Sequence, residues 1–129
     1  MASFRGIPNA AIQSYTAGEL FSKSFVFAKA GAKTAEGNFT LLKPTGTGDR
    51  LEGVTITDAP LGQGIGLVPR DSGMTVKITV ATGQTVAVGD RLGSDATEFE
   101  NAAPAAPNAI LTAMEAGVAT QVIEARLDT

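Results

Sequence analysis

Apolar and polar residues alternate in several short segments of this chain, and this period of two predicts β-strands with one buried face. The clearest segment is MTVKITV, residues 74–80, in which Met, Val, Ile and Val alternate with Thr and Lys. GQTVAVGDRL, residues 83–92, continues the apolar set after a turn. We expect the core to include Val76, Ile78, Val80, Val86, Val88 and Leu92.

Four further segments carry strand patterns. Residues 53–57 place Val and Ile on one face and Thr on the other, and residues 64–69 form a short apolar run that a proline ends. FSKSFVF, residues 21–27, has Phe at positions 21, 25 and 27, which share one face at a period of two and predict a core strand. The last segment, 119–127, predicts a closing strand that has on one face Gln121, Ile123, Ala125 and Leu127.

One segment predicts a helix instead. In PNAILTAMEAG, Asn108 is suited to the N-cap, Ile110, Leu111 and Met114 form an apolar stripe, and Gly117 is suited to the position after the last turn. Elsewhere the 15 glycines and the regularly spaced turn signals favour short strands. The sequence thus predicts an all-β fold, a small β-barrel or sandwich with one short helix.

The first residues do not follow either period. Phe4 and Tyr15 lie among Gly, Pro and Asn, as in an irregular arm that needs a partner to order it. A length of 129 residues fits one domain, so we expect a single domain over 1–129, with an irregular N-terminal arm at about 1–18 and a β-rich body at about 19–129.

The composition limits the side chains that are available for catalysis and metal binding. The chain has no Cys and no His, so it lacks thiolate ligands, imidazole ligands and the most common general base. We therefore expect no enzyme activity, no cofactor and no metal. The N-terminus has no signal-peptide pattern and no segment is long and apolar enough for a membrane span, so we expect neither secretion nor a membrane partner.

Charge and aromatic residues are both unevenly distributed. Residues 1–50 hold six bases against three acids, a net charge of +3, whereas residues 51–129 hold four bases against ten acids, a net charge of −6. All aromatic residues except Phe99 lie in the first 39 positions. This asymmetry is typical either of a solvated surface or of a basic front half that meets an acidic partner. The bases are scattered singly, which argues against a nucleic-acid partner.

The glycine-rich and acidic motifs favour structural roles. PTGTGD and GQGIG lack the frames of phosphate-binding loops, and DATEFEN, with Asp95, Glu98 and Glu100, lacks the ligand spacing of a calcium loop. In GQTVAVGDRLGSDA, Gly83 permits a turn into a strand, and Gly89 with Asp90 makes a tight corner, for which we expect a positive φ at Gly89. A structural corner explains this stretch better than a ligand site does.

The order of these features resembles the capsid cement (decoration) proteins of tailed phages. The resemblance covers Leu51 to Leu127, from LEGVTITDAPLGQGIGLVPRDSGMTVKITVATGQTVAVGDRLGSDA to NAILTAMEAGVATQVIEARL. It implies a structural protein of the virion, synthesised in the host cytoplasm and bound to the outer surface of the mature capsid. The implied partner is the major capsid protein, whose subunit contacts it would stabilise, commonly as a homotrimer.

Two expectations depend on this resemblance. The irregular arm would carry part of the capsid contact, through Phe4, Arg5, Ile7, Ile12 and Tyr15. The rival is a free-standing carrier or small-molecule-binding β-domain of the biotinyl or lipoyl type, in which a similar corner precedes a strand. A carrier displays one modified Lys at a hairpin tip, but here the nearest candidate, Lys77, lies within a predicted strand. The intact mass of the native protein would separate the two.

Overall fold

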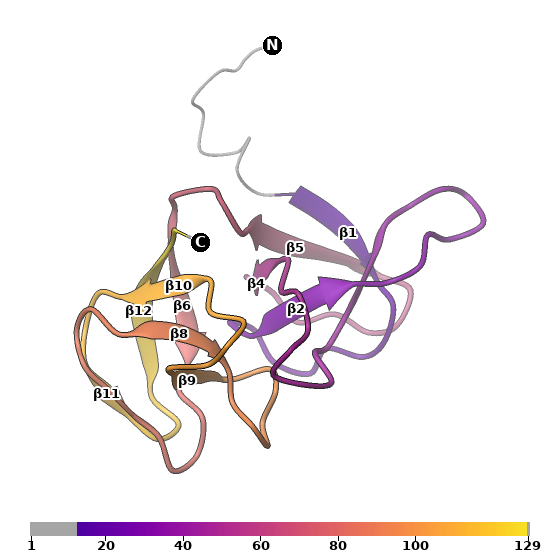
Figure 1. The fold of residues 1–129 in the computed structure, drawn as a ribbon. Helices are drawn as coiled ribbons and strands as arrows, with labels where there is room; N and C mark the ends of the chain where they lie inside the picture. Colours follow the sequence, from indigo (N-terminus) through magenta and orange to yellow (C-terminus); the bar gives the residue numbers. More distant parts are fainter. Residues whose placement is uncertain (1–12, 129) are drawn as a thin grey trace.

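The computed structural model describes residues 13–128, which form an all-β fold with no helix in that range (Figure 1). The twelve strands are short, as the frequent turn residues predict. In chain order they are β1 Gln13–Ala17, β2 Phe27–Ala30, β3 Thr40–Leu42, β4 Gly53–Thr55, β5 Gly64–Pro69, β6 Thr75–Thr79, β7 Thr85–Val86, β8 Arg91–Ser94, β9 Ala102–Pro104, β10 Leu111–Ala113, β11 Gly117–Val118 and β12 Val122–Leu127.

The first five strands form a closed barrel in the order β1-β3-β2-β4-β5. Strand β1 closes it, because it pairs antiparallel with β5 on one side and parallel with β3 on the other. Strands β4 and β5 approach closely at Gly53, where an added Cβ would lie 3.0 Å from the Cα of Pro69. A side chain at Gly53 would therefore push the two strands apart.

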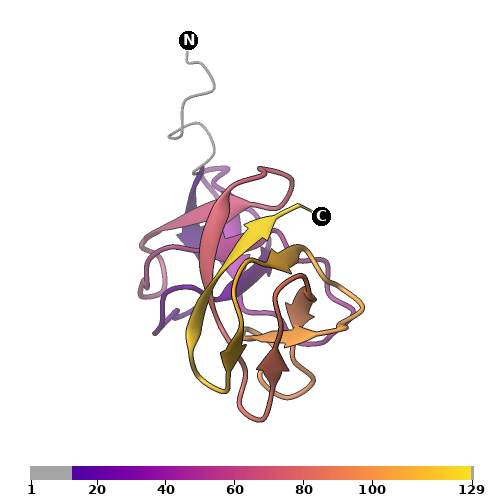
Figure 2. The same cartoon turned by 90° about the vertical axis from the view of Figure 1, so that its left-hand side faces the viewer.

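The second half is a five-stranded sheet in the order β6-β12-β10-β8-β9, with β7 and β11 paired beside it. Its longest pairing joins β6 and β12, which run side by side in Figure 2. A bridge between Val80 and Ala102 links the end of β6 to the start of β9. Because β6 and β9 are the two edge strands, this bridge curls the sheet towards a second barrel.

This arrangement creates two apolar cores. The barrel core lies inside the barrel, and the shared core lies between the barrel and the five-stranded sheet. Phe27 and Ala28 show how one strand serves both, since Phe27 belongs to the shared core and Ala28 to the barrel core. Leu67 and Val68 divide in the same way on β5. Such strands are buried on both faces, so Thr55, which the alternating pattern placed opposite the buried face, is fully buried.

The expected strands at 64–69, 74–80 and 119–127 are present as β5, β6 and β12. Five of the six residues expected in the core are buried: Val76, Ile78, Val80, Val86 and Leu92. The expectation for Val88 was wrong, because its side chain is 67% exposed. Strand β7 ends at Val86, so the alternation that would turn Val88 inward stops before the corner.

The expected helix at 107–117 was also wrong. Leu111 to Ala113 form strand β10, which pairs with β8 on one side and β12 on the other. Both Ile110 and Leu111 are buried, whereas Met114 is 45% exposed. Pairing between two strands thus overrides a local pattern that is only eleven residues long.

Two expectations near the N-terminus need correction as well. Residues 21–27 do not form one strand: Phe21 makes an isolated bridge with Ala59, and Phe25 has a φ of 61°, which breaks the alternation before β2. Residues 13–17, assigned to the irregular arm, form strand β1 of the barrel. The rest of that arm up to residue 12 lies outside the described residues.

Candidate functional site

An exposed aromatic group lies on the barrel where β1 begins. The rings of Tyr15 and Phe39 have centroids 6.5 Å apart and are tilted by 59°, and the Lys33 Nζ lies 4.7 Å from the centroid of the Phe39 ring. Phe39 is 57% exposed. We call Tyr15, Lys33 and Phe39 the aromatic patch. It combines a cation with apolar area, and exposed aromatic residues are common anchors of protein interfaces.

Local hydrogen bonds hold this patch in place. The Thr16 N–H donates to the Phe39 carbonyl at 2.9 Å, which fixes the loop beside β1. That loop is closed at Thr34, whose N–H donates to the Asn38 carbonyl at 2.8 Å. Burial, and then the negative charge of Glu52, raise the pKa of Tyr15, so its phenol keeps its proton at neutral pH.

Of the five residues predicted to contact a capsid, the structure places Tyr15, in a regular strand rather than an irregular arm. Phe4, Arg5, Ile7 and Ile12 lie outside the described residues. They precede the aromatic patch directly in the chain, because β1 begins at Gln13. A contact surface made by both would therefore be continuous along the sequence.

The predicted corner has the geometry of a tight turn. Gly89 has a φ of 91° and Gly83 a φ of 82°, both in the left-handed region that favours glycine. The Asp90 carboxylate accepts a hydrogen bond from the Ala87 N–H at 2.9 Å, and the Asp90 N–H donates to the Ala87 carbonyl at 3.1 Å. The Gly89 N–H donates to the Ala113 carbonyl, also at 2.9 Å. The two bonds between Ala87 and Asp90 close the corner, and the bond from Gly89 to Ala113 attaches it to β10.

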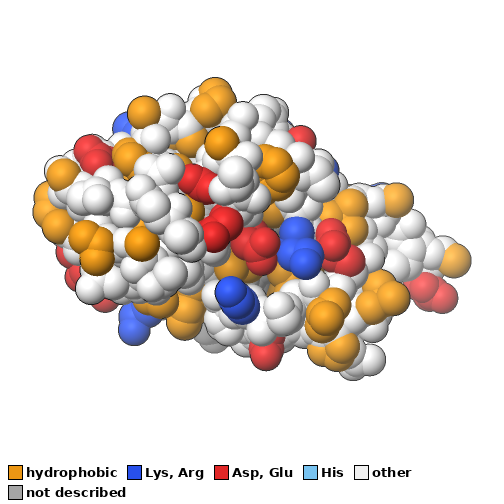
Figure 3. Space-filling view, turned by 90° about the horizontal axis from the view of Figure 1, so that it is seen from below, with side chains coloured by type: hydrophobic (Ala, Val, Ile, Leu, Met, Phe, Trp, Pro, Cys, Tyr) orange, Lys and Arg blue, Asp and Glu red, His pale blue; other side chains and the backbone are white. Residues whose placement is uncertain are grey.

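The corner also presents apolar side chains to solvent. Val88 at its tip is 67% exposed, Met114 beside Ala113 is 45% exposed, and Val118 on the paired strand β11 is 52% exposed. Figure 3 shows acidic and basic side chains next to one another in the middle of the lower face, with apolar side chains scattered around them.

The acidic loop after β8 has a structural role. Asp95 is 4% exposed. Its carboxylate accepts hydrogen bonds from the Thr97 N–H and the Glu98 N–H, each at 3.0 Å, and from Gln84 Nε2 at 2.8 Å. Burial raises the pKa of Asp95, but these hydrogen bonds outweigh it and lower the pKa to about 2. The ionised carboxylate therefore ties its loop to the turn before β7.

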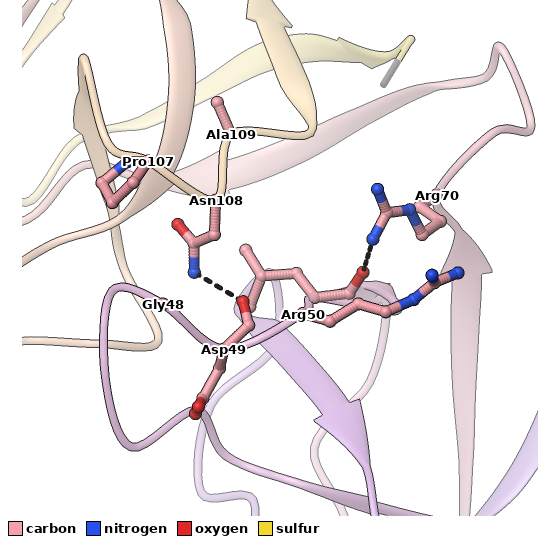
Figure 4. A pocket seen from close by; sticks show the side chains of 8 residues that line it. Gly48, Asp49, Arg50, Arg70, Pro107, Asn108 and Ala109 are labelled. Atoms are coloured by element: carbon pink, nitrogen blue, oxygen red, sulfur yellow. Dashed lines mark hydrogen bonds between the residues drawn. The ribbon is translucent and has the colours of Figure 1, made fainter.

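Asn108 connects the two halves of the molecule. Its Oδ1 accepts from the Ser94 N–H at 2.9 Å, and its Nδ2 donates to the Asp49 carbonyl at 3.0 Å (Figure 4). The neighbouring backbone is close, since an added Cβ at Gly93 would lie 2.8 Å from the Ala109 nitrogen. Asn108, expected as a helix N-cap, is instead a clamp between the barrel loop before β4 and strand β8.

A shallow pocket of about 440 Å³ opens beside this clamp. Arg50 and Arg70 border it, and the Arg70 guanidinium donates to the Leu51 carbonyl at 3.1 Å (Figure 4). Arg50 is paired with Glu52 at 3.3 Å. Both cations thus have partners within the fold, and the pocket is a seam between the two halves.

Sequence reasoning missed the roles of Asp95 and Asn108. The first has a local signal, because an Asp in a turn commonly accepts a hydrogen bond from the backbone N–H two residues later in the chain. The second has none, since its partners lie 14 and 59 residues away in the chain.

Three further features concern residues 13–128: a metal site, a membrane-spanning helix and a carrier lysine. That range contains no group of three or more acidic residues that could hold a metal ion. It also contains no helix that could span a membrane. Lys77 lies within β6 opposite Glu124 and not at the hairpin tip that a carrier domain needs.

The comparison with solved structures gives a structural relative. No protein-family model matches this chain, and neither does the sequence of any curated protein. Among solved structures, it is similar to the N base of the head fiber gp8.5 of bacteriophage phi29, with a TM-score of 0.66 and 13% sequence identity. The two chains share a fold. The match covers 90% of this chain and 92% of that one, so it includes both the barrel and the second sheet.

Proposed function

We propose that this chain is a structural protein of a tailed-phage head, which binds the outer surface of the mature capsid and stabilises contacts between major capsid protein subunits. The observation that carries the proposal is the fold shared with the base of a phage head fiber over nearly the full length of both chains. The resemblance of Leu51 to Leu127 to capsid cement proteins points the same way. The resemblance to cement proteins is also the ground on which we propose a homotrimer.

The chemistry of the acidic residues supports a structural role. Asp95 accepts hydrogen bonds from its own loop, and Asp49 accepts from the Thr45 N–H at 2.7 Å and pairs with Lys29 at 3.0 Å. Hydrogen bonds from Thr45 and Lys29 lower the pKa of Asp49. These carboxylates are occupied in holding loops, and we propose no catalytic step, cofactor or metal.

We place the capsid contact at the aromatic patch together with residues 1–12. The sequence predicts an irregular arm for this part of the chain, and ordering such an arm would cost about 1–2 kcal/mol for each residue, so the proposed contact must bury apolar groups to offset the cost. Phe4, Ile7 and Ile12 supply such groups, and Arg5 adds to the charge of Lys33. A basic and aromatic surface fits an acidic, partly apolar seam between capsid subunits.

A protein that binds only the mature lattice stabilises that lattice by mass action. The gain is about 2.7 kcal/mol per site when the free protein is at a hundred times its Kd. Many sites multiply this gain, so the affinity at each site need only be modest.

The proposal is tested by mixing the purified protein with mature and immature heads that lack it, and measuring co-sedimentation. We expect saturable binding to mature heads and weak binding to immature ones. Phe39→Ser should reduce occupancy on mature heads, because it removes an exposed ring from the aromatic patch. Val118→Ser is the matched control, since it removes an exposed apolar side chain from β11 in the other half of the molecule.

Equal loss of binding in both variants would contradict the placement at the aromatic patch. No binding of the wild-type protein to mature heads would overturn the proposed function itself.

A further inference from the structure

Within residues 13–128, the outer edge of β6 has no partner strand over its first three residues, Thr75 to Lys77. In an antiparallel pair, alternate residues point their N–H and C=O groups towards the partner strand. The Val80 N–H donates to the Gln121 carbonyl at 2.8 Å, so in the register of β6 and β12 the groups of Val76 and Ile78 also face β12. The groups of Thr75 and Lys77 therefore point the other way.

This edge is occupied at Thr79, where β6 ends, and is open at Thr75 and Lys77. The Thr79 N–H donates to the Phe25 carbonyl at 3.2 Å, away from β12, as the alternation requires. Within residues 13–128, no hydrogen bond uses the backbone N–H or C=O of Thr75 or Lys77. Both residues are exposed. Two donors and two acceptors are thus available to a further strand.

An apolar groove of about 350 Å³ runs beside this edge. Its lining combines residues of β6 and Glu124 of β12 with apolar side chains from the barrel and from the residue before β6: Phe25, Ile56, Val68 and Met74. Phe25 has a φ of 61°, a conformation that costs energy for a residue with a large side chain. The Phe25 N–H donates to the Thr55 carbonyl at 2.9 Å, and this bond helps to hold the residue at the groove.

We propose that this edge and groove bind an extended segment of the major capsid subunit, which adds a strand to β6 through main-chain hydrogen bonds to Thr75 and Lys77. This inference rests on the proposed function, and it adds a second contact that is separate from the aromatic patch. Strand addition takes its affinity from main-chain bonds and its specificity from side-chain pockets. The segment that fits has a free N–H at alternate positions and one apolar side chain for the groove.

The position of the barrel beside this edge favours a single extended segment over a second copy of this chain. The Phe25 carbonyl already accepts from the Thr79 N–H, and Phe25 and Ile56 line the groove, so the open stretch of the edge is short and lies next to the barrel. Neighbouring strands lie about 4.8 Å apart, so one added strand can approach β6 closely. The edge strand of a folded second copy brings its whole sheet with it, and that sheet would meet the barrel at Phe25 first.

The direct test is hydrogen exchange of the Thr75 and Lys77 amides, measured in the free protein and in the protein bound to mature heads. In the free protein both amides should exchange fast, and the Val76 and Ile78 amides should exchange slowly. On the heads, exchange at Thr75 and Lys77 should slow by at least about tenfold. If the protein binds heads while these two amides exchange as before, the strand addition is wrong and the proposed function stands. If the protein does not bind heads, both are wrong.

A substitution supplies an independent readout. Lys77→Pro removes one outward N–H but no bond to β12, and proline is tolerated on edge strands in this orientation. It should weaken head binding by about tenfold, the equivalent of one hydrogen bond of about 1.4 kcal/mol. Lys77→Thr is the matched control, since it changes the same side chain and keeps the N–H. Weakening by Lys77→Thr as large as that by Lys77→Pro would overturn the main-chain mechanism, and so would unchanged binding of a folded Lys77→Pro protein.

Discussion

Asp95→Asn should make the free energy of unfolding less dependent on pH in the acidic range. The size of the effect follows from the contacts of the Asp95 carboxylate. The Asp95 carboxylate is 4% exposed and accepts hydrogen bonds from Thr97, Glu98 and Gln84. Its pKa is lowered to about 2, against an ordinary value of 3.8. At 1.36 kcal/mol per pKa unit, the ionised form contributes about 2 kcal/mol of stability at neutral pH.

The sign of the pH dependence is fixed by the direction of the shift. A carboxylate whose pKa is lower in the folded state stabilises the protein above its unfolded pKa, and this contribution is lost as the pH falls towards the folded pKa. The wild-type protein should therefore lose about 2 kcal/mol from Asp95 between pH 5 and pH 2. Asp95→Asn removes the charge and should cost about 2–3 kcal/mol at pH 7, because amide hydrogens then face backbone donors.

The assay is urea denaturation of both proteins from pH 7 to pH 2. Contributions from other acids with lowered pKa values, such as Asp49 and Asp128, occur in both proteins and cancel in the difference. The gap between wild type and Asp95→Asn should shrink by about 2 kcal/mol between pH 5 and pH 2. Glu115→Gln, at an exposed carboxylate, is the control. A gap that stays constant over this range would refute the role of the Asp95 charge in holding the loop.

Four further perturbations test the shared core, the corner at Gly89, the hydrogen bonds of Asn108 and the proposed capsid contact. Ile78→Ala should cost about 2–5 kcal/mol by leaving a cavity in the shared core, and an unchanged denaturation midpoint would contradict its burial. Gly89→Val should cost about 1 kcal/mol or more because valine avoids positive φ, and wild-type melting with lost head binding would instead make the corner a contact site. Asn108→Ala should cost about 1–3 kcal/mol, seen as a lower melting temperature, since it leaves the Ser94 N–H and the Asp49 carbonyl without the clamp. Deletion of residues 2–12 should leave a folded protein with low occupancy on mature heads, and Arg5→Glu a smaller, salt-sensitive loss; normal decoration would move the contact elsewhere.

Among the strands that the sequence predicted, β6 and β12 have one solvent face and a clear alternation. Along β12, buried Ile123, Ala125 and Leu127 alternate with exposed residues, and this period is readable without knowledge of the partners. Strand β4 is buried on both faces, because it lies between the barrel core and the shared core. Its residues show how a second layer removes the alternation that the prediction depends on.

The errors arose where distant pairing decides the local structure. Residues 111–113 have the composition of a helix, but β8 and β12 supply hydrogen bonds on both sides and make them a strand. Tyr15 follows an irregular sequence, yet pairing with Ile65 on β5 makes it part of the barrel. For the candidate site, the sequence singled out the tight corner, but the approach of Phe39 and Lys33 to Tyr15 depends on the pairing of β1 with β3.

Electron cryomicroscopy of mature heads, incubated with the purified protein and compared with untreated heads, tests directly whether the protein binds the outside of the capsid. We expect additional density on the outer surface, at positions where major capsid subunits meet, into which the barrel and the five-stranded sheet fit with the aromatic patch towards the shell. Heads that carry no additional outer density at saturating protein, or density that contacts the interior of a single subunit only, would contradict it.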